Sequence, residues 1–249
     1  MLTIKNISKS FDGIKAVDDF SCSIDKGTIT GLIGPNGAGK TTVFNIITGF
    51  IQQDFGSFFL NDQNISTLPA YEIANRKIVR TFQDLRLITE LPVMENILLF
   101  FRKNPGDKLF NVFFNNKKIK QKESSNYKEA EKLLEFSGLL DKKNELAGNL
   151  SYGQQKLVTI CCCLASDPEI ILLDEPVSGV QPQTIEKISS MLKELVKNQN
   201  KTIFLIEHNM DFLFKNCDKV IVMDHGKKIK EGTSSEIEND QEILEAYLN

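Results

Sequence analysis

The chain has 249 residues, enough for one large domain or for a domain with an inserted subdomain. Hydrophobic residues make up 41% of it and charged residues 25%, which is typical of a globular protein with a buried core. The formal net charge of −3 argues against a nucleic-acid-binding protein, which usually carries a basic excess, so we expect no nucleic-acid partner.

The sequence contains no segment that we expect to enter a membrane. The N-terminal residues lack the apolar stretch of a signal peptide. The longest apolar runs, such as Ile97–Phe101 and Ile170–Leu173, fall far short of the roughly 18 residues that span a bilayer. If the protein acts at a membrane, another chain must cross it. The five cysteines, three of them consecutive, predict buried free thiols in a reducing cytosol rather than disulfides or zinc ligands.

The first part of the chain has strand patterns. Residues 2–24 alternate apolar and polar side chains around Asp12-Gly13, which predicts antiparallel strands joined by a turn. The β-branched and apolar run Thr28–Ile33 predicts a buried strand, and a helix is expected at Thr42–Thr48. A glycine-rich segment lies between the two, so the order is strand, glycine loop, helix.

Helical patterns dominate the middle, and strand patterns then return. We expect helices at Val93–Phe101, Lys128–Ser137 and Gln154–Leu164, then strands at Ile170–Leu173, Thr202–Ile206 and Val220–Met223, with further helices at Ile185–Val196 and Glu242–Leu248. Strands that alternate with helices are typical of a parallel sheet built from βαβ units. The sequence therefore predicts an α/β fold in which a helical subdomain interrupts a sheet-and-helix core.

Residues 102–128 form a basic segment. They contain eight Lys or Arg residues against Asp107 and Glu123, with Phe110, Phe113 and Phe114 among the charges. One interpretation is a surface that contacts anionic lipid headgroups or a membrane subunit. The other, which we favour, is a solvated insertion with a small aromatic anchor.

The glycine-rich segment fits a phosphate-binding loop. Its pattern, GxxxxGK followed by Ser or Thr, lets backbone N–H groups converge on phosphate oxygens at the start of a helix. Lys40 would reach the β- and γ-phosphates of ATP, and Thr41 would supply a hydroxyl group to Mg²⁺. The candidate nucleotide-binding residues here are Gly34, Pro35, Asn36, Gly37, Ala38, Gly39, Lys40, Thr41 and Thr42.

Two acidic residues follow the buried run Ile170–Leu173. Ligands bind at the carboxyl ends of strands in open α/β sheets, where Asp174 would emerge and hold Mg²⁺. Glu175 would lie beside the γ-phosphate and accept a proton from the attacking water. The pairing of this run with the phosphate loop makes the interpretation specific.

The segment Leu150–Gln155, with the sequence LSYGQQ, resembles the signature of ABC ATPases, which is usually LSGGQ. Tyr152 replaces the first glycine and leaves Ser151, Gly153 and Gln154 in register. P-loop kinases and GTPases have no such element. In this family the signature of one subunit binds the ATP held by the phosphate loop of another. The resemblance therefore implies ATP contacts from Ser151, Gly153 and Gln154.

Three further residues match the family in order and spacing. Gln83 in RTFQD resembles the Q-loop glutamine, which contacts Mg²⁺ or the attacking water, and His208 in LIEHNM resembles the switch histidine. Phe11 resembles the aromatic residue that stacks on adenine. Alone, Gln83 would be read as a surface residue, His208 as a helix-start residue and Phe11 as core. The resemblance instead implies Glu175, His208 and Gln83 as catalytic residues, and Thr41, Gln83 and Asp174 as metal ligands.

The resemblance covers essentially the whole chain and implies the ABC ATPase fold. This α/β fold has a P-loop NTPase core, an antiparallel β subdomain and an inserted helical subdomain. A single ATP-binding domain would span residues 1–249, with the core at about 1–88 and 166–249 and the helical subdomain at about 89–165. One departure is Gln181, which stands where the family commonly has Asp or Asn before a proline, and it leaves the inter-subunit geometry there open.

Details within the family indicate an importer. RTFQDLRL around Gln83, the insertion after Phe101, the YGQQ signature and the C-terminal ending all resemble the ATPases of branched-chain amino-acid importers. Implied partners are a second ATP-binding subunit, identical or related, and integral membrane subunits. They would hold the chain peripherally at the cytoplasmic face of the inner membrane.

Other assignments remain open. They are a urea or amide transporter, a lipopolysaccharide-export ATPase and a soluble ABC ATPase that is not coupled to transport.

Overall fold

The computed structural model describes residues 1–81, 85–102 and 116–243. They form two compact units. Unit 1 comprises Met1–Gln83, Glu169–Ser178 and Leu192–Asn249, and unit 2 comprises Asp84–Pro168 and Gly179–Met191. Unit 2 thus includes residues 179–191, which were predicted from the sequence to belong to the nucleotide-binding core at about 166–249.

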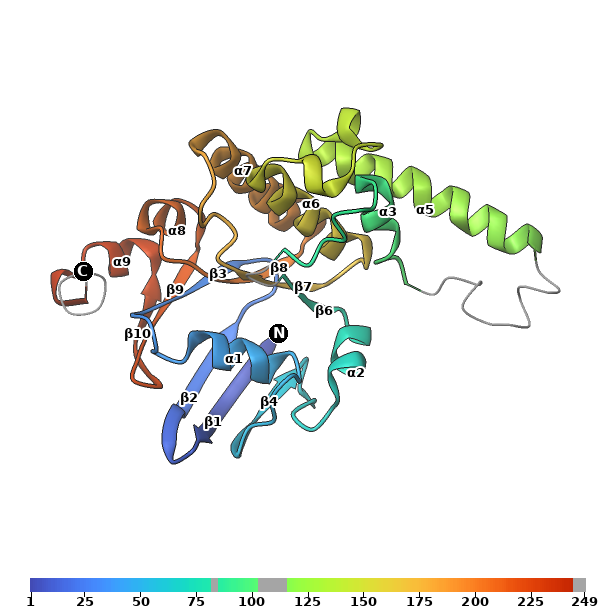
Figure 1. The fold of residues 1–249 in the computed structure, drawn as a ribbon. Coiled ribbons are helices and arrows are strands. Elements are labelled where there is room, and N and C mark those ends of the chain that lie inside the picture. Colours follow the sequence, from blue (N-terminus) through green and yellow to red (C-terminus); the bar gives the residue numbers. More distant parts are fainter. Residues whose placement is uncertain (82–84, 103–115, 244–249) are drawn as a thin grey trace. The chain divides into compact units, whose positions relative to one another are not determined.

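Unit 1 contains a six-stranded sheet in the order β10-β9-β3-β8-β7-β6 (Figure 1). Its strands are β3 (Ile29–Ile33), β6 (Ile78–Arg80), β7 (Ile170–Asp174), β8 (Thr202–Ile206), β9 (Lys219–Asp224) and β10 (Lys227–Thr233). All pair in parallel except β10, which pairs antiparallel with β9 at one edge. β3, β7 and β8 are buried along their whole length, as expected for central strands of a covered parallel sheet.

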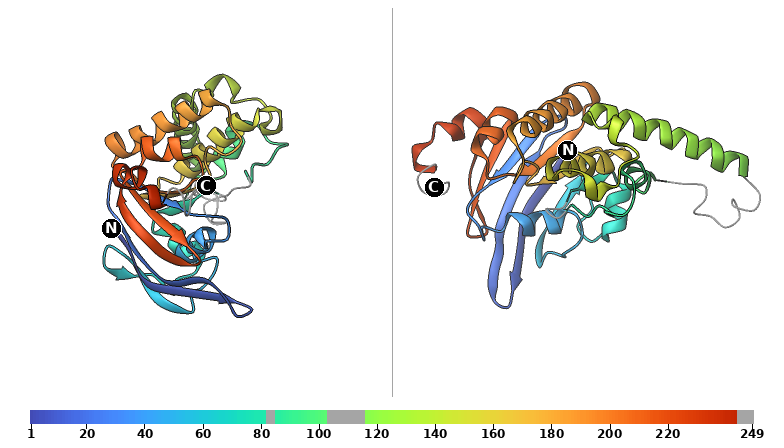
Figure 2. Two further views of the ribbon diagram at one scale, coloured as in Figure 1. Left: turned by 90° about the vertical axis from the view of Figure 1, so that its left-hand side faces the viewer. Right: turned by 45° about the horizontal axis from the view of Figure 1, so that its top comes forward.

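A second, antiparallel sheet in unit 1 has the order β2-β1-β4-β5. Its strands are β1 (Leu2–Phe11), β2 (Ile14–Ile24), β4 (Phe55–Leu60) and β5 (Gln63–Asn64). Figure 2 shows β1 and β2 as a long twisted hairpin. Asp12 and Gly13 turn between them with φ of 48° and 84°, which confirms the predicted turn.

Helix α1 (Lys40–Ile47) lies over the hydrophobic core of unit 1. The ring of Phe44 on α1 lies 5.0 Å from that of Phe204 on β8, so α1 packs on the six-stranded sheet. Buried residues of β1 and β2, including Ile4 and Phe20, belong to the same cluster. The other helices of this unit include α2 (Ala70–Asn75), α8 (Met210–Asn216) and α9 (Ser234–Glu238).

Unit 2 is built from helices. They are α3 (Val93–Leu98), α5 (Asn116–Ser137), two short 3₁₀ turns at Leu140–Lys142 and Ala147–Asn149, α6 (Tyr152–Ala165) and the start of α7 (Pro182–Gln199). α6 is buried from Lys156 to Ala165, including its three cysteines. All five cysteines are buried thiols outside any disulfide, as predicted.

Several elements differ from the sequence-based expectations. α5 begins at Asn116, twelve residues before the predicted Lys128, because its polar first turns carry Lys and Gln, which favour helix without an apolar pattern. The polar strand β10 and the short strand β6 were not predicted. The predicted C-terminal helix lies outside the described residues from 244 onward. Among the described residues, no helix has the length and apolar character needed to span a bilayer.

Candidate functional site

The loop between β3 and α1 borders a cavity of about 310 Å³ in unit 1. Every lining residue comes from the N-terminal part of unit 1 or from the ends of β7 and β8. The lining residues are Ala16, Asn36, Gly37, Ala38, Gly39, Lys40, Thr41, Thr42, Glu175, Ile206 and His208. The cavity therefore lies at the carboxyl ends of parallel strands, where α/β sheets bind their ligands.

Two glycines of this loop have no room for a side chain. Gly34 has φ of 147°, and a Cβ atom there would lie 1.9 Å from the carbonyl oxygen of Met223. Gly39 has φ of 100°, and its Cβ would lie 2.1 Å from the carbonyl oxygen of Ala16. Since both obstacles are backbone atoms, neither can move aside. Gly37, with φ of 83°, faces open space.

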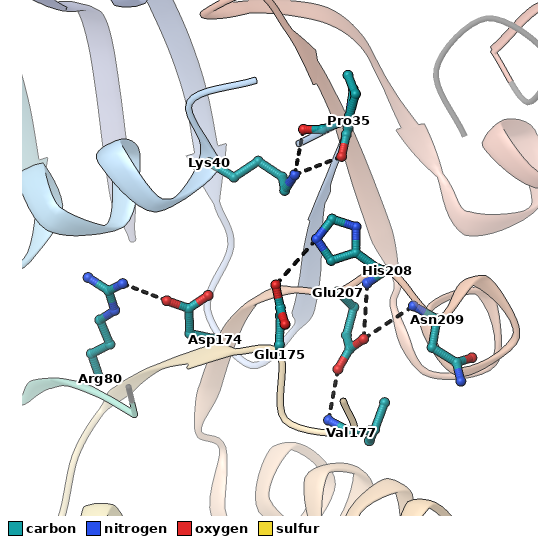
Figure 3. Close-up of polar contacts among 10 residues, drawn as sticks. Pro35, Lys40, Arg80, Asp174, Glu175, Val177, Glu207, His208 and Asn209 are labelled. Atoms are coloured by element: carbon teal, nitrogen blue, oxygen red, sulfur yellow. Dashed lines mark hydrogen bonds and ion pairs between the residues drawn. The ribbon is translucent and has the colours of Figure 1, made fainter. Parts of the chain in front are cut away.

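Lys40 lies across the loop with its side chain buried. Its Nζ donates hydrogen bonds to the carbonyl oxygens of Gly34 at 2.7 Å and Pro35 at 2.9 Å (Figure 3). Burial lowers the pKa of Lys40, and the nearby carboxylates of Glu175 and Asp174 oppose that shift. The ammonium group therefore lies among negative groups that stabilise its charged form.

Asp174 ends β7, and Arg80 on the neighbouring strand β6 holds its carboxylate. Arg80 Nη2 donates to Asp174 Oδ2 at 2.5 Å, and each side chain is only 4% exposed. Arg80 also donates to Asn45 Oδ1 on α1 at 2.6 Å and lies 5.4 Å from the ring centre of Phe44. This arginine joins the helix behind the phosphate loop to the strand that carries Asp174.

Glu175 and His208 face each other at the cavity. His208 Nε2 lies 3.3 Å from Glu175 Oε1. Glu175 has φ of 49°, a left-handed conformation that is uncommon outside glycine and that clusters at functional sites. Its backbone N–H donates to the carbonyl oxygen of Ile206 at 2.9 Å, which ties the end of β7 to the end of β8.

Glu207 stands between the end of β8 and His208 in the chain and is buried. Its carboxylate accepts hydrogen bonds from the backbone N–H groups of Val177, His208 and Asn209. Burial raises the pKa of Glu207, while these hydrogen bonds act in the opposite direction. The carboxylate therefore has its partners in the protein backbone rather than in solvent.

In unit 2, the signature segment forms the start of α6. Ser151 caps the helix by accepting from the N–H of Gln154 at 3.3 Å, and Gln154 Oε1 accepts from the N–H of Ser151 at 3.0 Å. A Cβ atom at Gly153 would lie 2.9 Å from Thr184 Oγ1, so a larger residue there would displace α7 side chains. Tyr152 is exposed, with Lys156 Nζ 5.6 Å from its ring centre.

The structure brings most predicted residues of unit 1 together. Residues 36–42, Glu175 and His208 line the cavity, and Gly34 and Pro35 contact Lys40. Phe11 is not among the lining residues. It lies at the end of β1, is 43% exposed and has Lys9 Nζ 5.6 Å from its ring centre. Gln83 lies outside the described residues.

The donors present fit Mg²⁺ bound together with a nucleotide. Among the described residues, no group of three or more His, Cys, Asp or Glu side chains could hold a metal by itself. The exposed hydroxyl of Thr41 lines the cavity, and the carboxylate of Asp174 is near enough to Lys40 to affect its pKa. This suits Mg²⁺, which proteins usually bind through one or two side chains plus substrate phosphates.

Sequence reasoning missed Arg80, Glu207 and Ala16. A signal existed for the first two, because Arg80 ends the apolar run of β6 and Glu207 directly follows the apolar run that ends β8. No sequence pattern indicated Ala16, because it lines the cavity only as a result of where the fold places β2.

Comparisons with known proteins show the family of the chain. Residues 17–178 match the ABC transporter family. The chain is 36% identical over 248 residues to the high-affinity branched-chain amino acid transport ATP-binding protein LivG of Escherichia coli (strain K12), covering 100% of this chain and 97% of that protein.

Comparisons with solved structures show the fold. The ADP conformation of MJ1267, an ATP-binding cassette of an ABC transporter, matches with a TM-score of 0.85 and 36% identity, covering 98% of this chain and 97% of that chain. The dimeric structure of MJ0796, a bacterial ABC transporter cassette, matches with a TM-score of 0.78 and 26% identity, covering 94% and 99%. The expected ABC ATPase fold is thereby confirmed. The chain belongs to the ABC transporter family and is an ATP-binding cassette, the ATPase subunit of such a transporter.

Proposed function

We propose that this chain hydrolyses Mg²⁺-ATP with Glu175 as general base and thereby powers the import of branched-chain or related amino acids. The observation that carries the catalytic part is the arrangement of Lys40, Glu175 and His208 around one cavity. Glu175 supplies an acceptor for a proton of the attacking water. His208, 3.3 Å from it, donates toward the γ-phosphate. Lys40 neutralises phosphate charge.

The phosphate loop binds the triphosphate through its backbone. Gly34 and Gly39 keep side chains out of the loop, and residues 36–42, which include the start of α1, line the cavity. The backbone N–H groups of this stretch would bind the phosphate oxygens. Thr41 and Asp174 would hold Mg²⁺ together with Gln83, and the metal would neutralise charge on the β- and γ-phosphates. Phe11 would stack on adenine.

The second half of each site comes from a partner subunit. We place Ser151, Gly153 and Gln154 against the γ-phosphate of ATP bound to the other subunit, since they form a capped helix N-terminus with donors to offer. The similar cassette MJ0796 has a dimeric structure, which supports pairing. Unit 1 would be the nucleotide-binding core, and unit 2 the helical subdomain.

The transport assignment rests on relatives. LivG is described as a high-affinity branched-chain amino acid transport ATP-binding protein, and it matches this chain over its whole length. We therefore place the chain at the cytoplasmic face of the membrane, held there by integral membrane subunits that cross it. The paired subunit is either a second copy or a related ATPase.

Two experiments test the proposal. The purified chain should hydrolyse Mg²⁺-ATP at a rate per chain that rises with concentration, and Lys40→Ala should abolish measurable Mg²⁺-ATP binding in isothermal titration calorimetry. Lys26→Ala, which removes an exposed lysine that does not line the cavity, is the matched control. An unchanged dissociation constant for Lys40→Ala would overturn the phosphate-loop assignment.

The transport assignment is tested separately. Deletion of the gene should abolish high-affinity uptake of radiolabelled leucine, and the wild-type gene but not Glu175→Gln should restore it. Unchanged leucine uptake after deletion would refute the substrate assignment and leave the ATPase assignment standing.

A further inference from the structure

Glu207 joins two loops that carry the proposed catalytic residues. It follows β8 and is 1% exposed. Oε1 accepts from the N–H of Val177 at 2.8 Å, whereas Oε2 accepts from the N–H groups of His208 at 3.0 Å and Asn209 at 3.2 Å (Figure 3). One oxygen thus binds the loop after β7, and the other binds the loop after β8.

Each loop presents one residue to the cavity. Val177 lies two residues after Glu175, and His208 follows Glu207 directly. The loops are also joined by the hydrogen bond from the N–H of Glu175 to the carbonyl oxygen of Ile206 and by the 3.3 Å contact between His208 Nε2 and Glu175 Oε1. Because the loops are 30 residues apart in the chain, no short covalent path fixes one against the other. The paired ends of β7 and β8 hold the start of each loop, and the carboxylate of Glu207 adds a buried constraint beyond them.

We propose that Glu207 is a positioning residue for ATP hydrolysis. It holds the loop of Glu175 and the loop of His208 at one separation, so that both side chains reach the γ-phosphate together. The inference rests on the proposed roles of Glu175 and His208. Glu207 itself does not line the cavity and touches no reacting atom.

A carboxylate is required at position 207 because the three backbone N–H donors lie on two sides of it, so that both side-chain oxygens must accept. An ionised glutamate can accept all three N–H groups through its two oxygens. A glutamine of the same shape has one acceptor oxygen and places an NH₂ group against either Val177 or the pair His208 and Asn209. Two N–H donors would then face each other, which leaves a buried donor unsatisfied.

The first test separates kcat from binding. Glu207→Gln should lower kcat for Mg²⁺-ATP at least about tenfold, because the loops of Glu175 and His208 would no longer be held at the separation that places both side chains at the γ-phosphate. Its dissociation constant for Mg²⁺-ATP should stay within about twofold, because no residue that lines the cavity is changed. The matched control is Asp211→Asn, which removes the same charge from an exposed position on α8 and should leave both constants unchanged.

The second test detects a change in the surroundings of the His208 ring by NMR. The chain has only two histidines, and the side chain of His225 is 95% exposed on the turn after β9. With ¹³C-labelled histidine, Glu207→Gln should shift or broaden the ring signal of His208 and leave that of His225 in place. A residue that served only the general stability of the core would leave both signals unchanged in the folded variant.

The third test is a mutant cycle. If Glu207 acts only by positioning Glu175 and His208, adding Glu207→Gln to the variant Glu175→Gln/His208→Ala should slow its residual ATP hydrolysis no further. Multiplying effects would contradict the positioning role. Should Glu207→Gln fail to fold, Glu207→Asp keeps the charge but shortens the reach, and it should show the same loss of kcat at unchanged affinity.

The outcomes distinguish the two proposals. A wild-type kcat in Glu207→Gln, or in Glu207→Asp where that variant replaces it, would refute the positioning role. The assignment of Glu175 as the base would still stand if Glu175→Gln is inactive. Normal hydrolysis by Glu175→Gln would refute the proposed base itself. Loss of Mg²⁺-ATP binding in the folded Glu207 variant would refute the positioning role, because it would mean that Glu207 supports the cavity as a whole.

Discussion

Arg80 and Asp174 form a buried ion pair that ties β6 to the end of β7. Removing one partner of such a pair leaves an uncompensated charge, which costs about 3–5 kcal/mol. Arg80→Ala should therefore destabilise the protein by that amount in urea unfolding at pH 7. The double variant Arg80→Ala/Asp174→Asn should be more stable than Arg80→Ala alone, because the stranded carboxylate is gone. If the two changes were additive, the pair would not be coupled.

The phosphate loop offers a matched pair of glycines. Gly39→Ala would place Cβ 2.1 Å from a backbone oxygen, whereas Gly37→Ala would place it in open space. Both have left-handed backbones, so both carry a strain of about 1–2 kcal/mol. We expect Gly39→Ala to lose Mg²⁺-ATP binding in calorimetry and Gly37→Ala to keep it. Equal affinities would show that the backbone contact at Gly39 does not shape the loop.

The features that could be predicted from the sequence are those formed by residues close together in the chain. The phosphate loop was predictable because its strand, glycines and helix are consecutive in the chain. Asp174 and Glu175 were predictable because four aliphatic residues precede them and define a buried strand end. In each case the pattern and the structure that it predicts lie in one continuous stretch of the chain.

Contacts between distant segments could not be predicted. Arg80 meets Asn45 and Asp174, 35 and 94 residues away, and only the sheet order makes these neighbours. The polar strand β10 is an edge strand with mostly exposed side chains, so it lacks the apolar alternation by which strands are recognised. The roles of all the site residues stay predictions, those of Gln83, Phe11 and the signature residues included.

The buried cysteines predict a loss of stability in alkali. Burial raises the pKa of Cys161 and Cys163 to about 12 from a usual value of 9.0. Between these values the unfolded chain releases protons that the folded chain keeps, so stability is full below pH 9 and falls as the pH rises. Each such thiol contributes a slope of about 1.4 kcal/mol per pH unit.

Urea unfolding between pH 9 and 11 measures this slope. Cys161→Ala should reduce it by the contribution of one thiol, and an unchanged slope would contradict the burial of this thiol in its neutral form. Ellman's reagent at pH 8 gives an independent check, because the folded protein should react only as fast as it unfolds.

Ser151 allows helix capping to be separated from nucleotide contact. Ser151→Ala removes the N-cap of α6 and should cost about 1 kcal/mol in urea unfolding. Ser151→Asp retains a good cap, so its stability should stay near that of the wild type. Its carboxylate would however repel the partner's γ-phosphate, so ATP-dependent dimerisation in light scattering should fail. Normal dimerisation of Ser151→Asp would contradict the proposed contact.

The central claim is that Glu175 is the base of a site completed by a second subunit. Glu175→Gln removes the proton acceptor, keeps the side-chain shape and should lower turnover at least about a hundredfold. With Mg²⁺-ATP, the variant should bind nucleotide and accumulate as a dimer in size-exclusion chromatography with light scattering. Hydrolysis at the wild-type rate, with no ATP-bound dimer, would contradict the account.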